Sequence, residues 1–538
     1  MASTTAQLRH PDGRVELRDA SSLHGSRFFN DELAPVPVER RTWTTYNYFA
    51  LWNGMAFNLP SYLLASGLIA IGMNWVQAFM TIAIGNVIVL VPMLLNSHAG
   101  TKYGIPFPVF ARAFFGVRGA NLAALLRGLV ACGWFGIQTW VGGQAVFVIL
   151  GKLFGDGWTG AAEFYDQPWT LWLCFAAFWA LQMAIIWRGM EAIKRLESWA
   201  APLVTVGFVI LLIWILIKAG GFGPIFSQES QLGWGAEFWA VFAPSLTGMI
   251  AFWATLSLNM PDFTRFGQGQ RKQAWGQVLG LPTTMSFIAI MSIMITSGGM
   301  VVYGEAIWDP VELASRFDSP IVVIAALLGI VLATITTNLA ANTVSPSYDF
   351  SNAFPRRISF RMGGLITGVI GVVIQPWRLI SDPNIYIYAW LGFYGGVLAT
   401  TAGVLAAGYW VQARRTLSLT DLFADGGGRY WFTGGWNWRA LAATVIGAVF
   451  AVGGAYSAPG EGPFPADGLI PILQPLYDYS WIVGLVVAFL AFLALSLPGG
   501  GGSNNPTSDN PKSHNPIPEE ETGERSGEGR PGPAAVDR

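Results

Sequence analysis

Charged residues are scarce in this chain. Asp, Glu, Lys and Arg together make up 12% of its 538 residues, whereas hydrophobic residues make up 53%. Because soluble domains carry about 25% charged residues, this composition excludes an ordinary soluble domain and indicates a polytopic membrane protein. The formal net charge is −1, so the chain has no basic excess for binding nucleic acid.

Cysteine and histidine are also rare. The two cysteines, Cys132 and Cys174, both fall in apolar segments, where free thiols are expected rather than a disulfide framework. No Asp, Glu or His falls in the central part of any expected span. We therefore expect no histidine metal site, no buried carboxylate relay for protons and no intramembrane protease. The chain is not expected to be an enzyme, and a substrate bound at mid-depth should be neutral.

Twelve apolar segments are long enough to cross a bilayer, at about 20 residues each. They lie at 44–71, 75–96, 121–151, 169–187, 198–218, 238–261, 277–301, 320–344, 362–377, 384–410, 439–457 and 480–498. Lys and Arg occur in alternate loops with a bias of about threefold, which places both termini in the cytoplasm. Residues 1–42 contain no apolar core, so we expect no cleavable signal peptide.

Two of these spans are interrupted. The first contains WNGMAFNLPSY at 52–62, and Pro60 predicts that the helix opens near Ala56. Freed backbone groups at this depth must be buried in protein or face a wet cavity, so the break predicts a binding site. The sixth span is interrupted within 246–261, where Gly248 lies near the middle of the span and Asn259 and Pro261 close its inner end. Interruptions five spans apart indicate inverted repeats with a site between them, although Gly and Pro are common in all membrane helices.

The chain accordingly divides into five parts. We expect a cytosolic N-terminal tail (1–42), a first five-helix repeat (43–218), a second five-helix repeat (219–410), two additional transmembrane helices (411–498) and a cytosolic C-terminal tail (499–538). The last part is rich in Gly, Pro, Ser, Asn and Glu and should be disordered, because such a segment cannot bury a core.

Amides, hydroxyls and tryptophans are the candidate ligands at mid-depth. Trp134 and Gln138 are four residues apart in GWFGIQTW and therefore share one helix face. Span six contributes Trp253. Each of these side chains has a purely structural alternative, since membrane amides also bond neighbouring helices and most tryptophans pack or anchor.

Span eight reads LATITTNLAAN at 332–342. Thr337 and Asn342 lie about 140° apart around a helix. One side of this helix is therefore expected to present hydroxyls to an ion such as Na⁺, and another side an amide to a substrate.

Four motifs occur in order along the chain. They are NSHAGTKYGIPFPVFAR (96–112), GWFGIQTW (133–140), NMPDFTRF (259–266) and TNLAANTVSPSYDFSNAFPRR (337–357). With these motifs the chain resembles the nucleobase:cation symporter-1 family of hydantoin, allantoin, uracil and cytosine permeases, over residues 30–445. The resemblance implies an all-α, amino-acid/sodium symporter-like fold with a five-plus-five inverted repeat and two C-terminal helices.

The resemblance also implies a substrate site. The ring of the substrate would stack between Trp134 and Trp253, and the amides of Gln138 and Asn342 would bind its ureido or imide edge. Asn58 takes the polar position at the break of the first helix. The better-known hydantoin transporter has Gln there, so the shorter Asn affects reach and substrate choice.

A cation site is implied in the same way. Its ligands would be the carbonyls of Gly54, Phe57 and Ala333 and the hydroxyls of Thr336 and Thr337. Na⁺ is the expected coupling ion, and H⁺ is the alternative because some relatives are proton-coupled. No other cofactor is expected.

We therefore expect a monomeric secondary active transporter in the lipid of the cell membrane. It would take up a neutral nucleobase or cyclic ureide of the allantoin, hydantoin or uracil type by cation-coupled alternating access. Two alternatives remain open. One is a proton-coupled permease for cytosine, purine or thiamine-like rings, and the other is a sensor that binds a ligand without transporting it.

Overall fold

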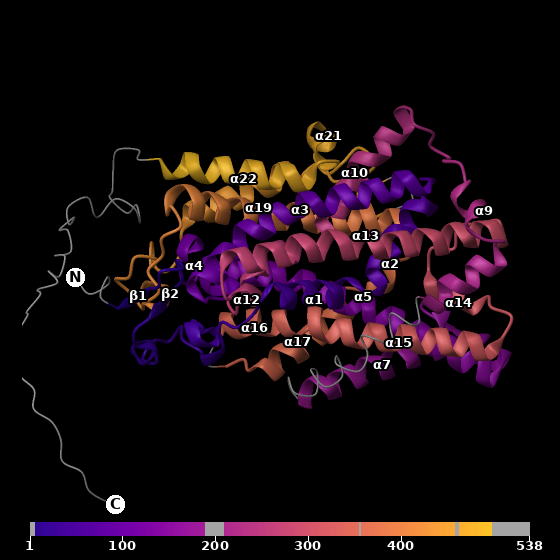
Figure 1. The fold of residues 1–538 in the computed structure, drawn as a ribbon, viewed down its shortest axis with the longest axis horizontal. Helices are drawn as coiled ribbons and strands as arrows, with labels where there is room; N and C mark the ends of the chain where they lie inside the picture. The colour runs from indigo at the N-terminus through magenta and orange to yellow at the C-terminus, as the bar shows by residue number, and fades with distance from the viewer. Residues whose placement is uncertain (1–5, 189–208, 355–356, 458–461, 498–538) are drawn as a thin grey trace, which may run out of the picture.

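The computed structural model describes residues 6–188, 209–354, 357–457 and 462–497. The protein is mostly helical, and its long helices run along the longest axis of the molecule (Figure 1). By length and apolarity, six described helices can cross a membrane, or up to seven if the bent pair at 471–477 and 480–496 counts as one span. The protein is thus a multi-pass membrane protein.

The expected spans coincide with helices wherever the structure describes them. The first four are α1 (Thr45–Ala56) with α2 (Leu59–Ala70), α3 (Trp75–Tyr103), α5 (Ala120–Phe154) and α7 (Trp169–Arg188). The fifth lies partly outside the described residues, and its end, Val209–Lys218, is helical. The next four are α10 (Ala236–Phe252) with α11 (Ala254–Asn259), α13 (Gln270–Tyr303), α15 (Pro320–Asn342) and α17 (Phe360–Val373).

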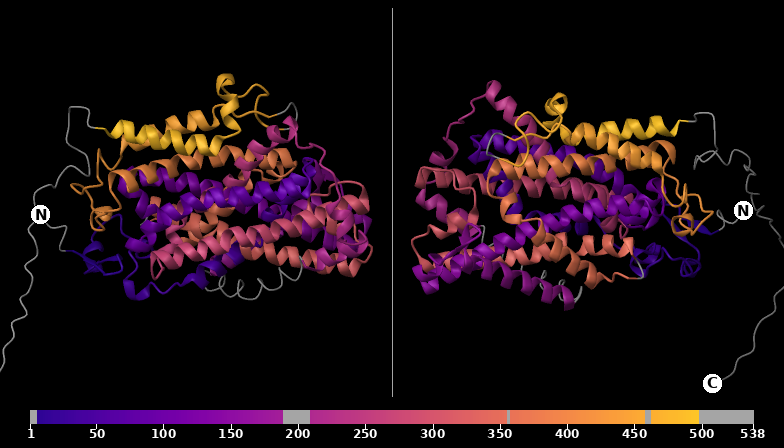
Figure 2. Two further views of the ribbon diagram at one scale, coloured as in Figure 1. Left: turned by 45° about the horizontal axis from the view of Figure 1, so that its top comes forward. Right: turned by 180° about the vertical axis from the view of Figure 1, so that it is seen from behind.

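The remaining expected spans include a segment with π-helical ends. The tenth comprises the π-helix η4 (Ile385–Leu391), α19 (Gly392–Ala406) and the π-helix η5 (Ala407–Gln412), and the last two are α20 (Trp438–Val452) and α22 (Ser480–Ser496). Helix α22, drawn in yellow, lies along one side of the bundle in every view (Figure 2) and packs against α19 and α20. The number of membrane crossings and the inverted repeat stay predictions.

Short elements connect the long helices. The short helices are α4 (Phe107–Phe115), α6 (Asp156–Thr159), α9 (Phe222–Phe226), α12 (Pro261–Thr264), α14 (Pro310–Ser315), α16 (Val344–Ala353), α18 (Pro376–Leu379) and α21 (Gln474–Tyr477). Two hairpins, β1 (Gln7–Arg9) with β2 (Val15–Leu17) and β3 (Glu163–Phe164) with β4 (Gln167–Pro168), are both antiparallel. These hairpins are the exceptions to the all-α expectation among the described residues.

The segment 6–42 is folded against one end of the bundle and is not a free tail. The buried Arg41 side chain donates through Nε to the Val36 carbonyl and through Nη2 to the Val15 carbonyl, both at 2.8 Å. The Arg112 side chain of α4 donates to the Phe28 carbonyl at 3.0 Å. Val15, Leu23 and Leu33 of this segment are also buried in the main hydrophobic core. A hydrophobic pattern could not predict this packing, because these residues are dispersed and buried guanidinium groups share in holding the segment. The predicted C-terminal tail lies outside the described residues.

Helix α5 is at the centre of the side of the bundle that positions the site. It packs against α7, α15, α16 and α17. Small residues allow these close approaches: a Cβ at Gly136 would clash with the backbone of Gly371 on α17, a type of contact that membrane helices favour. Cys132 and Cys174 are buried, free thiols.

Candidate binding site between two helix breaks

The first interruption opens near Ala56, as the sequence predicts. Helix α1 ends at Ala56 and, after two non-helical residues, α2 begins. Asn58 is the N-cap of α2: its Oδ1 accepts from the Ser61 N–H at 2.7 Å, and its Nδ2 donates to the Met55 carbonyl at 2.6 Å. Pro60 stands in the first turn of α2, where a missing N–H has little cost.

The break redirects two backbone N–H groups. In an unbroken helix, the Asn58 N–H would bond to the Gly54 carbonyl. It bonds instead to the Ala56 carbonyl at 2.8 Å. Likewise, the Ser61 N–H bonds to the Asn58 side chain and not to the Phe57 carbonyl. Two predicted cation ligands, the carbonyls of Gly54 and Phe57, therefore lose their helical donors. Gly54 is exposed and Phe57 is half-buried.

The sixth span breaks at Trp253, inside the interrupted segment that the sequence predicts at 246–261. Trp253 separates α10 from α11 with φ −99° and ψ 10°. The Tyr394 hydroxyl donates to the Ala251 carbonyl at 2.9 Å, so a carbonyl beside the break has a partner. Gly248 has a packing role instead: a Cβ there would lie 2.8 Å from Cγ2 of Ile387, so glycine allows η4 to approach α10.

One cavity between the two breaks collects every side chain that was predicted to bind the ring. Its lining includes Asn58, Trp134, Gln138, Trp253 and Asn342. All five are buried, with at most 8% of their surface exposed, and the cavity has a volume of about 50 Å³. Thr337 lines the same cavity. The helix geometry predicts that the Thr337 hydroxyl and the Asn342 amide serve separate sites on two sides of α15, but both side chains line this one cavity.

Aromatic rings form much of the cavity wall. The Trp134 ring meets Phe252 edge to face with centroids 5.3 Å apart, and Phe252 meets Trp253 in the same way at 4.9 Å. Trp253 also contacts Trp52 at 5.2 Å. The two tryptophans that were predicted to hold the ring are thus joined through Phe252. The sequence carries no signal for Phe252 beyond its position next to Trp253.

The amides of Asn342 and Gln138 differ in their hydrogen bonding. Asn342 Nδ2 donates to Asn338 Oδ1 at 3.0 Å. Asn338 Nδ2 in turn donates to Gln182 Oε1 at 2.8 Å and to the Phe135 carbonyl at 3.0 Å. Gln138 Oε1, in contrast, is buried without a hydrogen-bond partner in the described part of the chain. Since a buried, unpaired acceptor costs about 1–3 kcal/mol, this oxygen favours a ligand that brings an N–H.

The predicted cation ligands of α15 lie near the first break. Helix α15 contacts both α1 and α2. Ala333 belongs to the same buried cluster as Leu59, and Phe57 packs against that cluster. The Thr336 hydroxyl donates to the Ala333 carbonyl at 3.0 Å, and the Thr337 side chain faces the cavity. Of the five predicted cation ligands, only Thr337 lines the cavity.

A buried ion pair lies beside this cavity, and sequence reasoning missed it. Arg127 of α5 lines the cavity, and its Nε donates to Asp349 Oδ2 at 2.9 Å. Both side chains are 1% exposed. Asn259, with its amide oriented to satisfy its neighbours, accepts from Arg127 Nη1 at 3.0 Å and from Ser345 Oγ at 2.8 Å. Because these charges pair within the protein, the cavity still suits a neutral ligand.

No carboxylate was expected in the central part of a span, and the buried Asp349 lies beyond the expected end of the eighth span at 344. Asp349 lies in α16, which follows α15 directly and carries the helical path beyond the expected end of the span. Arg127 was the available signal, since a cation within an apolar span requires a partner.

Comparison with known proteins gives one consistent result. Residues 35–484 match the family of permeases for cytosine/purines, uracil, thiamine and allantoin. The chain is 41% identical to an allantoin permease of Bacillus subtilis over 482 residues, which cover 88% of this chain and 94% of the relative. It is 37% identical to a purine–uracil permease of Arabidopsis thaliana over 484 residues, which cover 90% of this chain and 80% of that relative.

Solved structures agree with the sequence relatives. A nucleobase-cation-symport-1 family transporter, closed with bromovinylhydantoin bound, is 25% identical with a TM-score of 0.69, covering 87% of this chain and 95% of that one. A Na⁺-coupled sialic acid symporter in a substrate-bound outward-open state is 13% identical with a TM-score of 0.57. The match covers 88% of this chain and 93% of that one. The second likeness concerns the fold alone.

Proposed function

Because the chain belongs to the family of permeases for cytosine/purines, uracil, thiamine and allantoin, we propose that it is a secondary active transporter that carries a neutral nucleobase or cyclic ureide together with a cation. It belongs to a family of transporters and not of enzymes. The observation that carries the proposal is the tryptophan-walled cavity between the helix breaks, with its unpaired Gln138 oxygen.

Recognition of the ring follows from the donors and acceptors of the cavity. Gln138 Oε1 accepts an N–H of the ring. Asn342 commits one N–H to Asn338, so its oxygen and its second N–H are available to a ureido edge. Trp134 and Trp253 provide the aromatic faces. Since the cavity is much smaller than the roughly 300–1,000 Å³ of drug-sized pockets, the ligand is small and the walls must move apart to admit it. Allantoin is the first candidate and uracil the second.

The cation lies between the first break and α15. The carbonyls of Gly54 and Phe57 lack their helical donors, and unwound carbonyls are the groups that bind Na⁺ in transporters with broken helices. The carbonyl of Ala333 and the hydroxyls of Thr336 and Thr337 complete the set. Na⁺ bound there joins α1 and α2 to α15.

Proton coupling is the alternative. The observation that favours it is the buried Asp349 carboxylate, whose Oδ1 has no hydrogen-bond partner in the described ranges. Uptake driven by a Na⁺ gradient without a pH gradient supports Na⁺ coupling. Uptake driven by a pH gradient without a Na⁺ gradient supports H⁺ coupling.

Transport then proceeds by alternating access around the site between the breaks. The full architecture comprises twelve spans: repeats at 43–218 and 219–410, followed by two additional helices at 411–498. Breaks in the first and sixth segments, which meet at one cavity, support this division. Both termini are cytoplasmic in the plasma membrane, as the Lys and Arg bias of the loops indicates, and the protein is a monomer.

The experiment that tests this function is uptake of labelled allantoin, uracil and a hydantoin into proteoliposomes, with an inward Na⁺ gradient and with K⁺ in its place. Accumulation above the external concentration supports a transporter. Binding without accumulation supports the sensor instead, and the absence of binding by every ring contradicts the proposal.

A further inference from the structure

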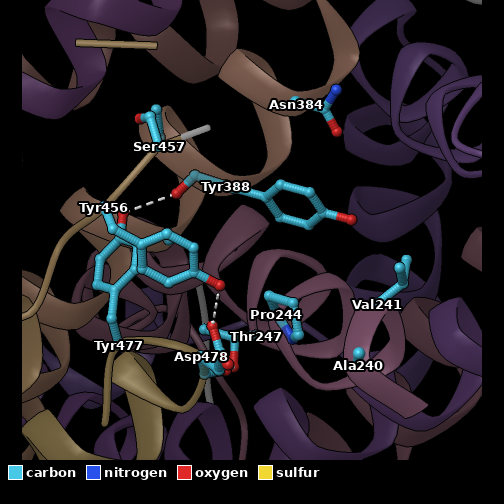
Figure 3. A pocket seen from close by; sticks show the side chains of 12 residues that line it. Ala240, Val241, Pro244, Thr247, Asn384, Tyr388, Tyr456, Ser457, Tyr477 and Asp478 are labelled. Atoms are coloured by element: carbon cyan, nitrogen blue, oxygen red, sulfur yellow. Dashed lines mark hydrogen bonds between the residues drawn. The ribbon is translucent and has the colours of Figure 1, made fainter. Parts of the chain in front are cut away.

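A second cavity, of about 220 Å³, lies apart from the first. Residues of α10, η4, the segment after α20 and the turn between α21 and α22 line it (Figure 3). Neither the family resemblance nor the proposed transport assigns it a role. No residue of its lining belongs to the predicted substrate or cation site.

The π-helix η4 contacts residues that line both cavities. Tyr386 of η4 is buried, its hydroxyl donates to the Pro60 carbonyl at 3.1 Å, and its ring lies 6.1 Å from that of Trp134. Two residues later, Tyr388 lines the second cavity, with its hydroxyl 3.3 Å from Ser245 Oγ. One short segment therefore contacts the proposed substrate site with one side and the second cavity with the other.

The second cavity contains an uncompensated carboxylate. Asp478 Oδ1 accepts from the Tyr456 hydroxyl at 2.9 Å, and the Thr247 hydroxyl holds the Asp478 backbone carbonyl at 2.6 Å. In the part of the chain that the structure describes, Oδ2 has no hydrogen-bond partner. No Lys, Arg or His of that part forms an ion pair with Asp478. A partly buried carboxylate is stabilised by a cationic partner, so a bound cation would complete this group.

The walls around this carboxylate are aromatic and apolar. In Figure 3, the rings of Tyr456 and Tyr477 lie on one side of the hollow, and Val241 and Ala240 lie on the other. Cations bind to the faces of aromatic rings as well as to carboxylates. We propose that this cavity binds a small organic cation with an apolar body, such as an arylalkyl primary amine, with its ammonium at Asp478.

Occupation of this site would restrain η4. The Tyr477 hydroxyl donates to the Tyr388 carbonyl at 2.7 Å, so the turn that carries Asp478 is already attached to η4. A cation that contacts both the turn with Asp478 and η4 strengthens this attachment. If the substrate cavity must widen during transport, a restrained η4 slows uptake without competition for the ring. This consequence rests on the proposed function, whereas the binding itself does not.

The test measures binding of benzylamine to the purified full-length protein by thermal shift, with benzyl alcohol as the uncharged counterpart. Benzylamine should raise the melting temperature in a saturable manner, and benzyl alcohol should not. Asp478→Asn should weaken the benzylamine affinity at least about tenfold, a change of about 1.4 kcal/mol. Asp467→Asn, at an exposed carboxylate of the same loop region, is the matched control and should keep the affinity.

A second variant keeps the test decisive if Asp478→Asn does not fold. Ala240→Trp places a large ring at the rim of the cavity from an exposed position and should also abolish the benzylamine shift. Equal shifts in the wild type and both variants, no shift in the wild type, or displacement of benzylamine by saturating allantoin would overturn the proposal. Failure of all ring uptake contradicts the proposed function but does not affect this binding measurement.

Discussion

Asn58 Oδ1 accepts a hydrogen bond from the Ser61 backbone N–H at 2.7 Å, so the side chain that is proposed to meet the ligand also starts helix α2. Its Nδ2 is committed in part to the Met55 carbonyl. The same amide therefore shapes the break and presents its remaining lone pair and N–H to the cavity. Any substitution of Asn58 therefore combines a structural effect with a functional one.

Asn58→Ala removes the cap and the ligand contact, whereas Asn58→Ser keeps a capping oxygen and loses only reach. Loss of an N-cap costs about 0.5–2 kcal/mol, so Ala should lower the thermal stability and Ser should nearly preserve it. Both variants should lose allantoin uptake. Uptake by Asn58→Ser at the wild-type rate would show that Asn58 serves the helix break alone.

Trp134 tests the aromatic wall. Stacking a ring on an aromatic side chain contributes about 1–3 kcal/mol, so Trp134→Ala should weaken ligand binding roughly tenfold to a hundredfold. Trp134→Phe retains an aromatic face and its contact with Phe252 and should lose less. Ligand titration of the two purified variants gives the comparison, and equal losses would exclude stacking.

Thr337 tests the cation site, because its side chain faces the cavity while Thr336 is bonded within its own helix. Thr337→Val keeps the shape and removes the oxygen, so Na⁺ stimulation of uptake in proteoliposomes should fall. Thr337→Ser should restore it. A Na⁺ response in Thr337→Val that matches the wild type would refute the assignment of this hydroxyl.

Gln182 tests the chain of amides behind Asn342. Gln182 accepts from Asn338, which in turn accepts from Asn342. Interhelical hydrogen bonds in membranes are worth about 0.6–2 kcal/mol, so Gln182→Leu should raise KM by a factor of about 3 to 30. In an Asn342→Ala background it should have no further effect on KM. A full additional loss in the double variant would show that Gln182 acts elsewhere.

Part of this site was predictable from the sequence. Pro60 and the residues around it predicted an opening near Ala56, and the helix ends there, because proline chemistry is local. The four-residue spacing of Trp134 and Gln138 predicted a shared face, and both line one cavity. The long apolar segments were predictable because a bilayer of given thickness requires a continuous run of about 20 apolar residues, which is visible in the sequence itself.

What the sequence could not predict depends on tertiary contacts. The sequence predicted an interruption within 246–261 but could not locate it at Trp253, because the roles of nearby residues depend on the packing of η4 against Gly248 and on the bond from Tyr394 to the Ala251 carbonyl. The partner of Arg127 lies 222 residues away. The N-terminal segment is held by the bond from Arg112 to the Phe28 carbonyl and by the buried side chains of Val15, Leu23 and Leu33, which are too far apart in the sequence to form an apolar pattern. Only the folded chain brings these groups together.

Gln138 provides the most direct test of the central claim, because its Oε1 is buried without a partner among the residues that the structure describes. Removing such an atom with Gln138→Leu should leave the thermal stability unchanged or raise it, since an unpaired buried acceptor costs about 1–3 kcal/mol. The decisive measurement is Na⁺-driven allantoin accumulation in proteoliposomes by the wild type and by this variant. The wild type should accumulate allantoin, and the equally stable Gln138→Leu protein should not. Accumulation by Gln138→Leu with the wild-type KM would contradict the assignment of this cavity as the substrate site.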